Sequence, residues 1–159
     1  MIQGKINEEL INIPTNWGDV PFKKYIEFLN HETALDQASC LLGVPTTTLN
    51  KLNSEALGAL FTALQFMHEA PNAYLEKDKQ IDIGRESYGK LEMAKSLLLQ
   101  HDKPKDALIG IAKIYTDIDF SEVATDEANP ICAFFFLHSK SSLSVIKDWT
   151  TINQAKRKR

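Results

Sequence analysis

The sequence predicts a mainly α-helical protein: a single-domain helical bundle of about six to seven helices with a minimal two-stranded β element at about residues 8–13 and 80–84. Apolar residues recur every three to four positions over most of the chain, which is the period of a helix with one buried face. Only two short segments resemble strands. With 159 residues, of which 43% are hydrophobic and 25% charged, the chain can bury a core without disulfides.

The first third of the chain is predicted to contain one strand and one helix. The strand covers residues 6–13 and ends at Pro14. After a turn-rich segment over 15–21, Asp19 is placed to cap a helix. Its apolar stripe recurs at i, i+3, i+4 and i+7, and consists of Phe22, Tyr25, Ile26 and Leu29.

Three further helical segments precede residue 71. A helix is predicted from about Thr33 to Leu42 and ends at Gly43, since glycine favours the left-handed conformation that follows a helix. A turn or short helix over 46–52 comes next, and a longer helix covers about 54–69. The longer helix carries small side chains that allow another helix to approach closely, at Ala56, Ala59 and Ala63.

The second half of the chain is predicted to add one strand and four helices. The strand at 80–84 is expected to pair with residues 8–13, because a lone strand leaves backbone groups unpaired. An acidic loop is expected at 117–127. The helices are predicted near residues 88–98, 108–115, 128–138 and 142–155.

The charge of the chain is unevenly distributed. The net charge is −3, but without the last four residues the chain has 14 basic and 21 acidic side chains, a net charge of −7. We therefore separate a single α-rich domain over residues 1–155 from a basic tail over 156–159. Such a tail suits an acidic partner or nucleic acid. It consists of Lys156, Arg157, Lys158 and Arg159.

No catalytic pattern is found, so we expect no enzyme, no cofactor and no metal. The glycines are too far apart for a phosphate-binding loop, and the four histidines lie more than 30 residues apart. A calcium loop starting at Asp117 would need glycine and glutamate where Glu122 and Ala128 stand. No apolar run approaches the length of about 20 residues of a membrane helix, so no membrane partner is expected.

Residues 34–52 allow an alternative function, a helix-turn-helix DNA-binding regulator. Gly43 stands between two predicted helices, and the second would present Thr46, Thr47, Asn50 and Lys51 to a major groove. Lys51 is the only lysine or arginine between residues 31 and 66, where three acidic residues also lie. This charge disfavours binding to a polyanion.

Two aromatic segments are candidate contact surfaces for another protein. Tryptophan and tyrosine are favoured at interfaces because they bury much area at a low entropy cost. Trp17 stands in a loop, where it either closes the edge of the core or anchors a partner; Phe22 and Tyr25 follow it. In the second segment three aromatic residues are consecutive, so a helix cannot bury all of them on one narrow stripe. They are Phe134, Phe135 and Phe136.

These segments resemble small tail-assembly-chaperone-type and related virion proteins of tailed bacteriophages. The resemblance rests on Ile-Pro-x-x-Trp-x-x-Val-x-Phe-x-x-Tyr-x-x-Phe-Leu over 13–29, Leu-Leu-Gly-Val-Pro over 41–45 and Leu-x-x-Leu over 49–52, with similar segments at 81–84, 107–115 and 134–137. It implies a non-enzymatic structural or assembly role in the tail, neck or portal region, through contacts with other virion or assembly proteins in a ring or a tail or portal complex. The expected location is the host cytoplasm during assembly, or the virion. The basic tail departs from the pattern and could face packaged DNA or an acidic portal surface.

Overall fold

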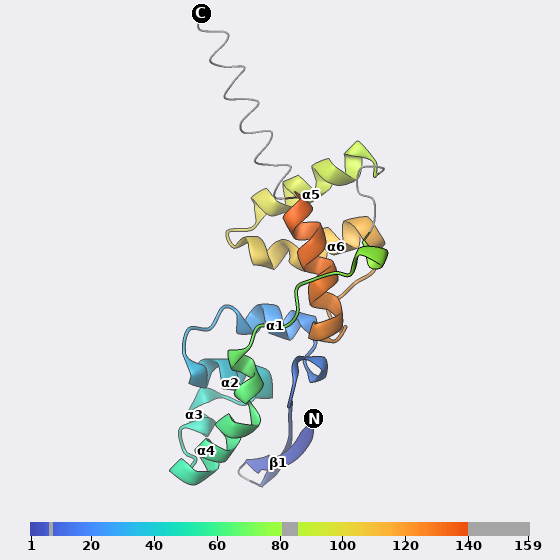
Figure 1. The fold of residues 1–159 in the computed structure, drawn as a ribbon. Coiled ribbons are helices and arrows are strands. Elements are labelled where there is room, and N and C mark those ends of the chain that lie inside the picture. Colours follow the sequence, from blue (N-terminus) through green and yellow to red (C-terminus); the bar gives the residue numbers. More distant parts are fainter. Residues whose placement is uncertain (7, 81–85, 140–159) are drawn as a thin grey trace, which may run out of the picture. The chain divides into compact units, whose positions relative to one another are not determined.

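The computed structural model describes residues 1–6, 8–80 and 86–139 (Figure 1). It is mainly helical and contains a two-stranded antiparallel sheet, which confirms the predicted fold class. Within the predicted domain of residues 1–155 the chain forms two compact units. Of the described residues, those of Met1–Asn72 and Phe120–Asn129 form unit 1, and those of Ala73–Asp119 and of 130–139 form unit 2. The predicted helix over 142–155 and the basic tail over 156–159 lie outside the described residues.

The sheet is an N-terminal hairpin of β1 (Ile2–Ile6) and β2 (Glu9–Ile13), in which Ile2 lies opposite Ile13 and Ile6 opposite Glu9. This partner differs from the predicted one at 80–84; residues 81–85 lie outside the described residues. The hairpin has a lower entropic cost of loop closure than the predicted pairing of 8–13 with 80–84, because only two residues join its strands. One of them, Glu8, has a φ of 69°, and positive φ is what a two-residue hairpin loop requires.

A 3₁₀ turn, η1 (Trp17–Asp19), leads into α1 (Phe22–Phe28). The predicted cap of this helix is wrong, because Pro21 holds the N-cap position and the Asp19 carboxylate accepts the backbone N–H of Thr15 at 2.9 Å instead. The helix ends one residue before Leu29. Phe28 is buried, whereas Leu29, which the stripe predicted to be buried, is 38% exposed.

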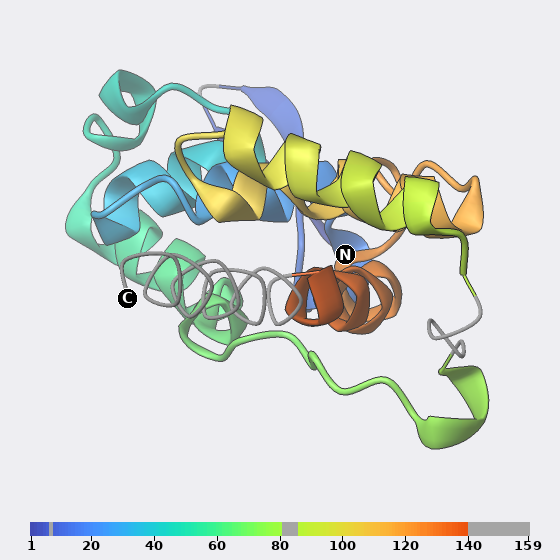
Figure 2. The same ribbon diagram turned by 90° about the horizontal axis from the view of Figure 1, so that it is seen from above.

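Helices α2 (Ala34–Leu42), α3 (Thr46–Leu49) and α4 (Ser54–Ala63) follow in unit 1, and η2 (Gln65–His68) continues after α4 (Figure 2). The Thr33 side chain caps α2, and Gly43 ends it with a φ of 68°, as predicted. The residues of the predicted helix over 54–69 form α4 and η2, which meet at Leu64.

Residues 120–129 complete unit 1 by pairing with the start of α1. The backbone N–H of Phe22 donates to the carbonyl oxygen of Val123 at 2.8 Å, and the buried Thr125 hydroxyl donates to that of Val20 at 2.6 Å. The core of unit 1 is a cluster of buried side chains. It comprises Ile6, Trp17, Val20, Phe28, Ala38, Leu41, Leu49, Leu60, Leu64 and Met67.

Unit 2 contains η3 (Lys77–Lys79), α5 (Tyr88–Gln100), η5 (Pro104–Ala107) and α6 (Leu108–Thr116). A further helix over 125–139 contributes its residues from Pro130 onward. Helix α6 approaches α5 closely at Gly110, where a Cβ atom would lie 2.5 Å from Cδ2 of Leu97. The rings of Tyr115 and Phe135 stack at 4.9 Å between centroids with an interplanar angle of 5°.

Candidate protein-interaction site

The Trp17 side chain lies in the core of unit 1. It is 8% exposed, and its ring makes edge-on contacts with Tyr25, Phe28 and Phe66 at centroid distances of 4.9, 5.3 and 5.0 Å. Its indole N–H donates to the carbonyl oxygen of Glu69 at 2.7 Å. The sequence left two roles open for Trp17, to close the edge of the core or to anchor a partner. The structure supports the first role.

The two other aromatic residues of this segment differ in exposure. Phe22 is fully buried, so neither it nor Trp17 offers a surface to a partner. Tyr25 is half-buried, and this burial raises the pKa of its hydroxyl above the ordinary value. Of the predicted contact residues in this segment, only Tyr25 therefore retains exposed area.

The three side chains of the Phe134–Phe136 triplet differ in exposure, which confirms the prediction that a helix cannot bury all of them. Phe135 is 1% exposed, stacks on Tyr115 and lies 5.4 Å from the edge-on ring of Phe134. Phe134 and Phe136 are partly exposed, and the following Leu137 is 61% exposed. These side chains leave some apolar surface on unit 2.

The segment predicted as a helix-turn-helix does form two helices about Gly43. The second, α3, has only four residues. Its Thr46 hydroxyl donates to the Asp36 carboxylate of α2 at 3.3 Å, so one of the side chains predicted to read DNA is bound within the protein. A recognition helix must lie in a major groove and present several side chains to it, and one helical turn is short for this purpose.

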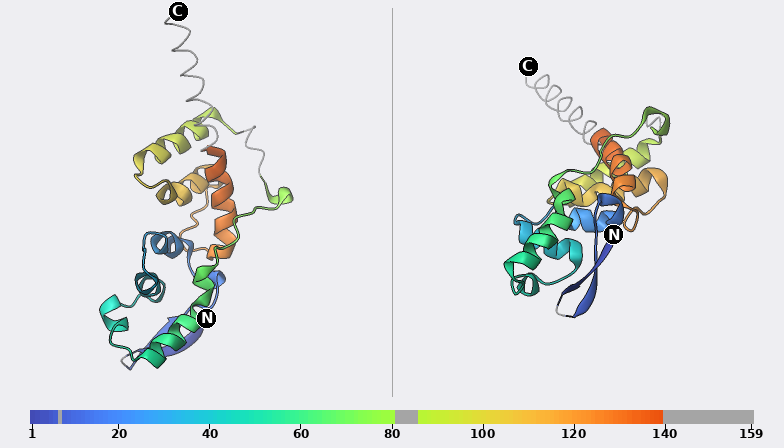
Figure 3. Two further views of the ribbon diagram at one scale, coloured as in Figure 1. Left: turned by 60° about the vertical axis from the view of Figure 1, so that its left-hand side comes forward. Right: turned by 60° about the horizontal axis from the view of Figure 1, so that its bottom comes forward.

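Figure 3 shows the backbone of the N-terminal hairpin (blue) and of α4 (green) from two further sides. An apolar groove that was not predicted from the sequence lies between the hairpin and α4 in unit 1. It has a volume of about 310 Å³. Strand β1, strand β2, Leu52 and one face of α4 line it. The lining residues are Ile2, Gly4, Lys5, Ile6, Ile11, Ile13, Leu52, Ala56, Ala59, Leu60 and Ala63.

Small side chains on α4 keep this groove open. Ala56 and Ala59 are exposed and Ala63 is half-buried, while the facing Ile2 of β1 is 48% exposed. These alanines were predicted to allow close approach of a helix; in the structure they face the hairpin across an open groove instead. The alanine pattern was thus the one signal in the sequence that could have located the groove.

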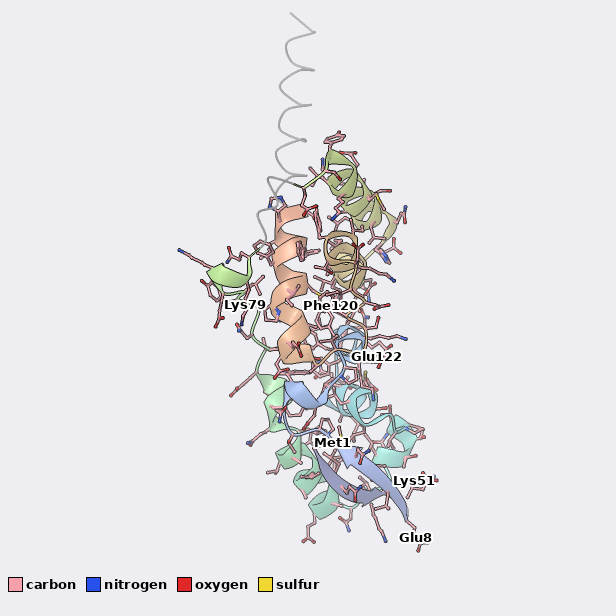
Figure 4. All side chains as sticks on the ribbon, turned by 90° about the vertical axis from the view of Figure 1, so that its right-hand side faces the viewer. Met1, Glu8, Lys51, Lys79, Phe120 and Glu122 are labelled. Carbon is pink, nitrogen blue, oxygen red and sulfur yellow. The ribbon has the colours of Figure 1, made fainter. Side chains whose placement is uncertain are left out.

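Among the described residues that line the groove, Lys5 is the one charged residue. Its side chain is exposed and makes no ion pair among the residues that the structure describes. Figure 4 shows the side chains of the hairpin, with Met1 at its start and Glu8 at its turn. The groove is therefore an apolar surface with a single positive charge at its strand side.

A second hollow, of about 430 Å³, lies on unit 1 beside Asp19 and Lys24. Its charges already have partners. The N-terminal amine lies 2.6 Å from the Asp19 carboxylate, and the hydrogen bond from this amine, with a further one from the Thr15 backbone, lowers the pKa of Asp19 to about 2. Lys24 donates to the carbonyl oxygen of Leu41 at 3.2 Å. The charged groups that line this hollow are thus paired within the chain, whereas Lys5 in the groove makes no ion pair among the described residues.

The described part of the chain offers no activated thiol and no cluster of three metal-ligating side chains among its His, Cys, Asp and Glu residues. Burial raises the pKa of Cys132 to about 12 and also raises that of Cys40, which opposes thiolate formation. None of the described helices is long and apolar enough to cross a membrane. Comparison of the chain with protein-family models, curated proteins and solved structures gives no match.

Proposed function

We propose that this protein is a non-enzymatic structural or assembly component that acts by binding other proteins. The single observation that carries the proposal is the apolar groove between the hairpin and α4. Every groove-lining alanine and isoleucine except the buried Ile6 is exposed or half-buried, and a partner that covers them gains about 25 cal/mol for each Å² of apolar surface removed from water.

The class of assembly is proposed from the sequence. From the resemblance to tail-assembly-chaperone-type and related virion proteins, we propose that the protein acts in the tail, neck or portal region of a tailed bacteriophage. Its partners are then other virion or assembly proteins, and its location is the host cytoplasm during assembly or the finished virion. In this proposal the basic tail contacts an acidic protein face or packaged DNA.

Co-expression with each protein encoded by the neighbouring genes tests this function. We expect one of these proteins to elute with the wild-type chain as a complex in size-exclusion chromatography. The variant Ala59→Arg should weaken this complex, because the arginine fills the groove. The matched variant Gly58→Arg should retain it, since Gly58 is exposed on the same helix, does not line the groove and has no atom within 4 Å of an added Cβ.

Two results would contradict the proposal. One is the absence of a complex with every neighbouring protein while the purified chain is folded. The other is turnover of a small molecule that follows the purified protein through several chromatographic steps. Salt-dependent binding of the wild-type chain to duplex DNA, lost in Lys51→Glu, would instead favour the regulator using residues 34–52.

A further inference from the structure

We infer that the groove binds one extended segment of a partner protein, which adds as a third strand to the free edge of β1, places apolar side chains against α4 and brings a carboxylate to Lys5. This inference rests on the proposed function and specifies the chemistry of the partner at its site.

The first argument is the free edge. Among the residues that the structure describes, β1 has β2 as its one strand partner, so alternate residues of β1 direct their backbone N–H and C=O groups away from β2. Side chains alternate between the faces of a strand, and Lys5 therefore faces away from its neighbours Gly4 and Ile6. All three residues line the groove, and so does Ile2, so the groove follows β1 along its length. An extended chain in it can satisfy these backbone groups.

The second argument is the size and composition of the groove. A volume of about 310 Å³ accommodates a few aliphatic side chains, whereas a helix is about 10 Å across with its side chains. A strand presents every second side chain to one face, so a segment paired with the five residues of β1 directs two or three side chains into the groove. Strand addition of this kind obtains affinity from main-chain hydrogen bonds and specificity from alternate side chains.

The third argument is charge. Lys5 is the only charged lining residue, is exposed and makes no ion pair within the described chain. A carboxylate on the incoming strand complements it. Strand β1 itself, Ile-Gln-Gly-Lys-Ile, has no carboxylate, so a second copy of this chain paired through β1 does not supply one.

Two labelled peptides test the inference by fluorescence anisotropy with the full-length chain. In the first, eight residues long, valine alternates with threonine and one central threonine is replaced by glutamate; in the second, lysine replaces this glutamate. We expect the wild-type chain to bind the glutamate peptide at least fivefold more tightly than the lysine peptide. Lys5→Glu should reverse this order, and its control Lys23→Glu, an exposed change of equal charge on α1, should leave the order unchanged.

The shape of the site is tested in the same assay. Ala59→Arg should weaken binding of the glutamate peptide at least tenfold, and Gly58→Arg should bind it as the wild type does. N-methylation of two alternate backbone nitrogens on one edge of the peptide should abolish binding, and the same change on the other edge should not. Circular dichroism of each variant before the titration establishes that it is folded.

The outcomes separate this inference from the proposed function. Equal affinity of the wild type for the two peptides overturns the pairing of a carboxylate with Lys5, and no effect of N-methylation on either edge overturns strand addition; either result overturns the inference. If a neighbouring protein forms a complex sensitive to Ala59→Arg while neither peptide binds, the inference fails and the proposed function stands. Self-association of the chain that is lost in Ala59→Arg would assign the groove to a second copy and also overturn the inference.

Discussion

Replacement of Trp17 by alanine should destabilise unit 1 strongly, because this side chain connects three parts of the unit. It belongs to η1, its ring contacts Tyr25 and Phe28 of α1, and it also contacts Phe66 and the carbonyl oxygen of Glu69. The last two residues lie about fifty positions further along the chain. The substitution therefore removes contacts that hold η1 to α1 and to η2.

The expected loss is 3–5 kcal/mol in the free energy of unfolding, which is about the range measured when a buried phenylalanine or tryptophan is replaced by alanine. Two terms in this structure add to the loss of buried area. Each edge-on aromatic pair contributes about 0.5–1.5 kcal/mol, and the hydrogen bond to the carbonyl oxygen contributes about 1 kcal/mol. Trp17→Phe keeps an aromatic ring but loses the hydrogen bond, so its cost should be smaller, about 1–2 kcal/mol.

Urea unfolding followed by far-ultraviolet circular dichroism measures both variants without using tryptophan as the probe. Leu10→Ala is the control, because Leu10 also belongs to unit 1, is 67% exposed and should change the free energy of unfolding by less than about 0.5 kcal/mol. If Trp17→Ala costs less than about 1 kcal/mol and weakens only the complex with a partner, Trp17 is an interface anchor and the packing argument is refuted.

Three further predictions follow from single residues. The pKa of Asp19 is about 2 in the folded chain against 3.8 ordinarily, so its contribution to the free energy of unfolding is complete above pH 3.8 and is lost as the pH falls towards 2. Asp19→Asn should lower the free energy of unfolding at pH 7 by about 1 kcal/mol after solvent screening. This difference, measured by urea unfolding, should shrink below pH 3.8, and a difference independent of pH would contradict the ion pair. Gly43→Ala should lower the free energy of unfolding by about 1 kcal/mol, because the φ of Gly43 is 68°. Gly58→Ala, at an open position of α4, should raise it by about 0.5–1 kcal/mol in the same measurement. Equal effects of the two substitutions would refute the conformational argument. Cys132 is fully buried with a pKa of about 12, so iodoacetamide at pH 8 should alkylate it only in urea, as mass spectrometry would detect; alkylation in the native chain at the unfolded rate would contradict its burial.

Local chemistry explains why the helices were predictable. Thr33 accepts the backbone N–H of Asp36 and Gly43 takes the left-handed conformation, so both ends of α2 are determined by residues within or next to it. The strand partner was not predictable in the same way. Both 2–6 and 80–84 contain two isoleucines on one face of a strand, and the choice between them depends on the closure of a two-residue connection.

The candidate site was less predictable than the fold because it is defined by space between distant elements. Ala56, Ala59 and Ala63 form a small-residue face, and such a face is equally compatible with a close helix or with an open groove. Which of the two occurs depends on where the hairpin, some fifty residues earlier in the chain, lies against α4. Trp17 was ambiguous for the same reason, because its partners Phe66 and Glu69 are far from it in sequence.

The burial of Trp17 and Phe22 also bears on how unit 1 can bind a partner. Aromatic anchors that are committed to the core cannot be withdrawn for binding without the loss of the contacts that they make there. Binding at the groove requires no such loss, since its alanines and its isoleucines other than Ile6 are accessible in the folded unit, as is the outer edge of β1. A partner that adds a strand there would bury apolar surface and pair backbone groups that the fold leaves to solvent. The aromatic core thus supports the packing of the hairpin and α4, and the groove between them is the surface that we propose for the contact with a partner.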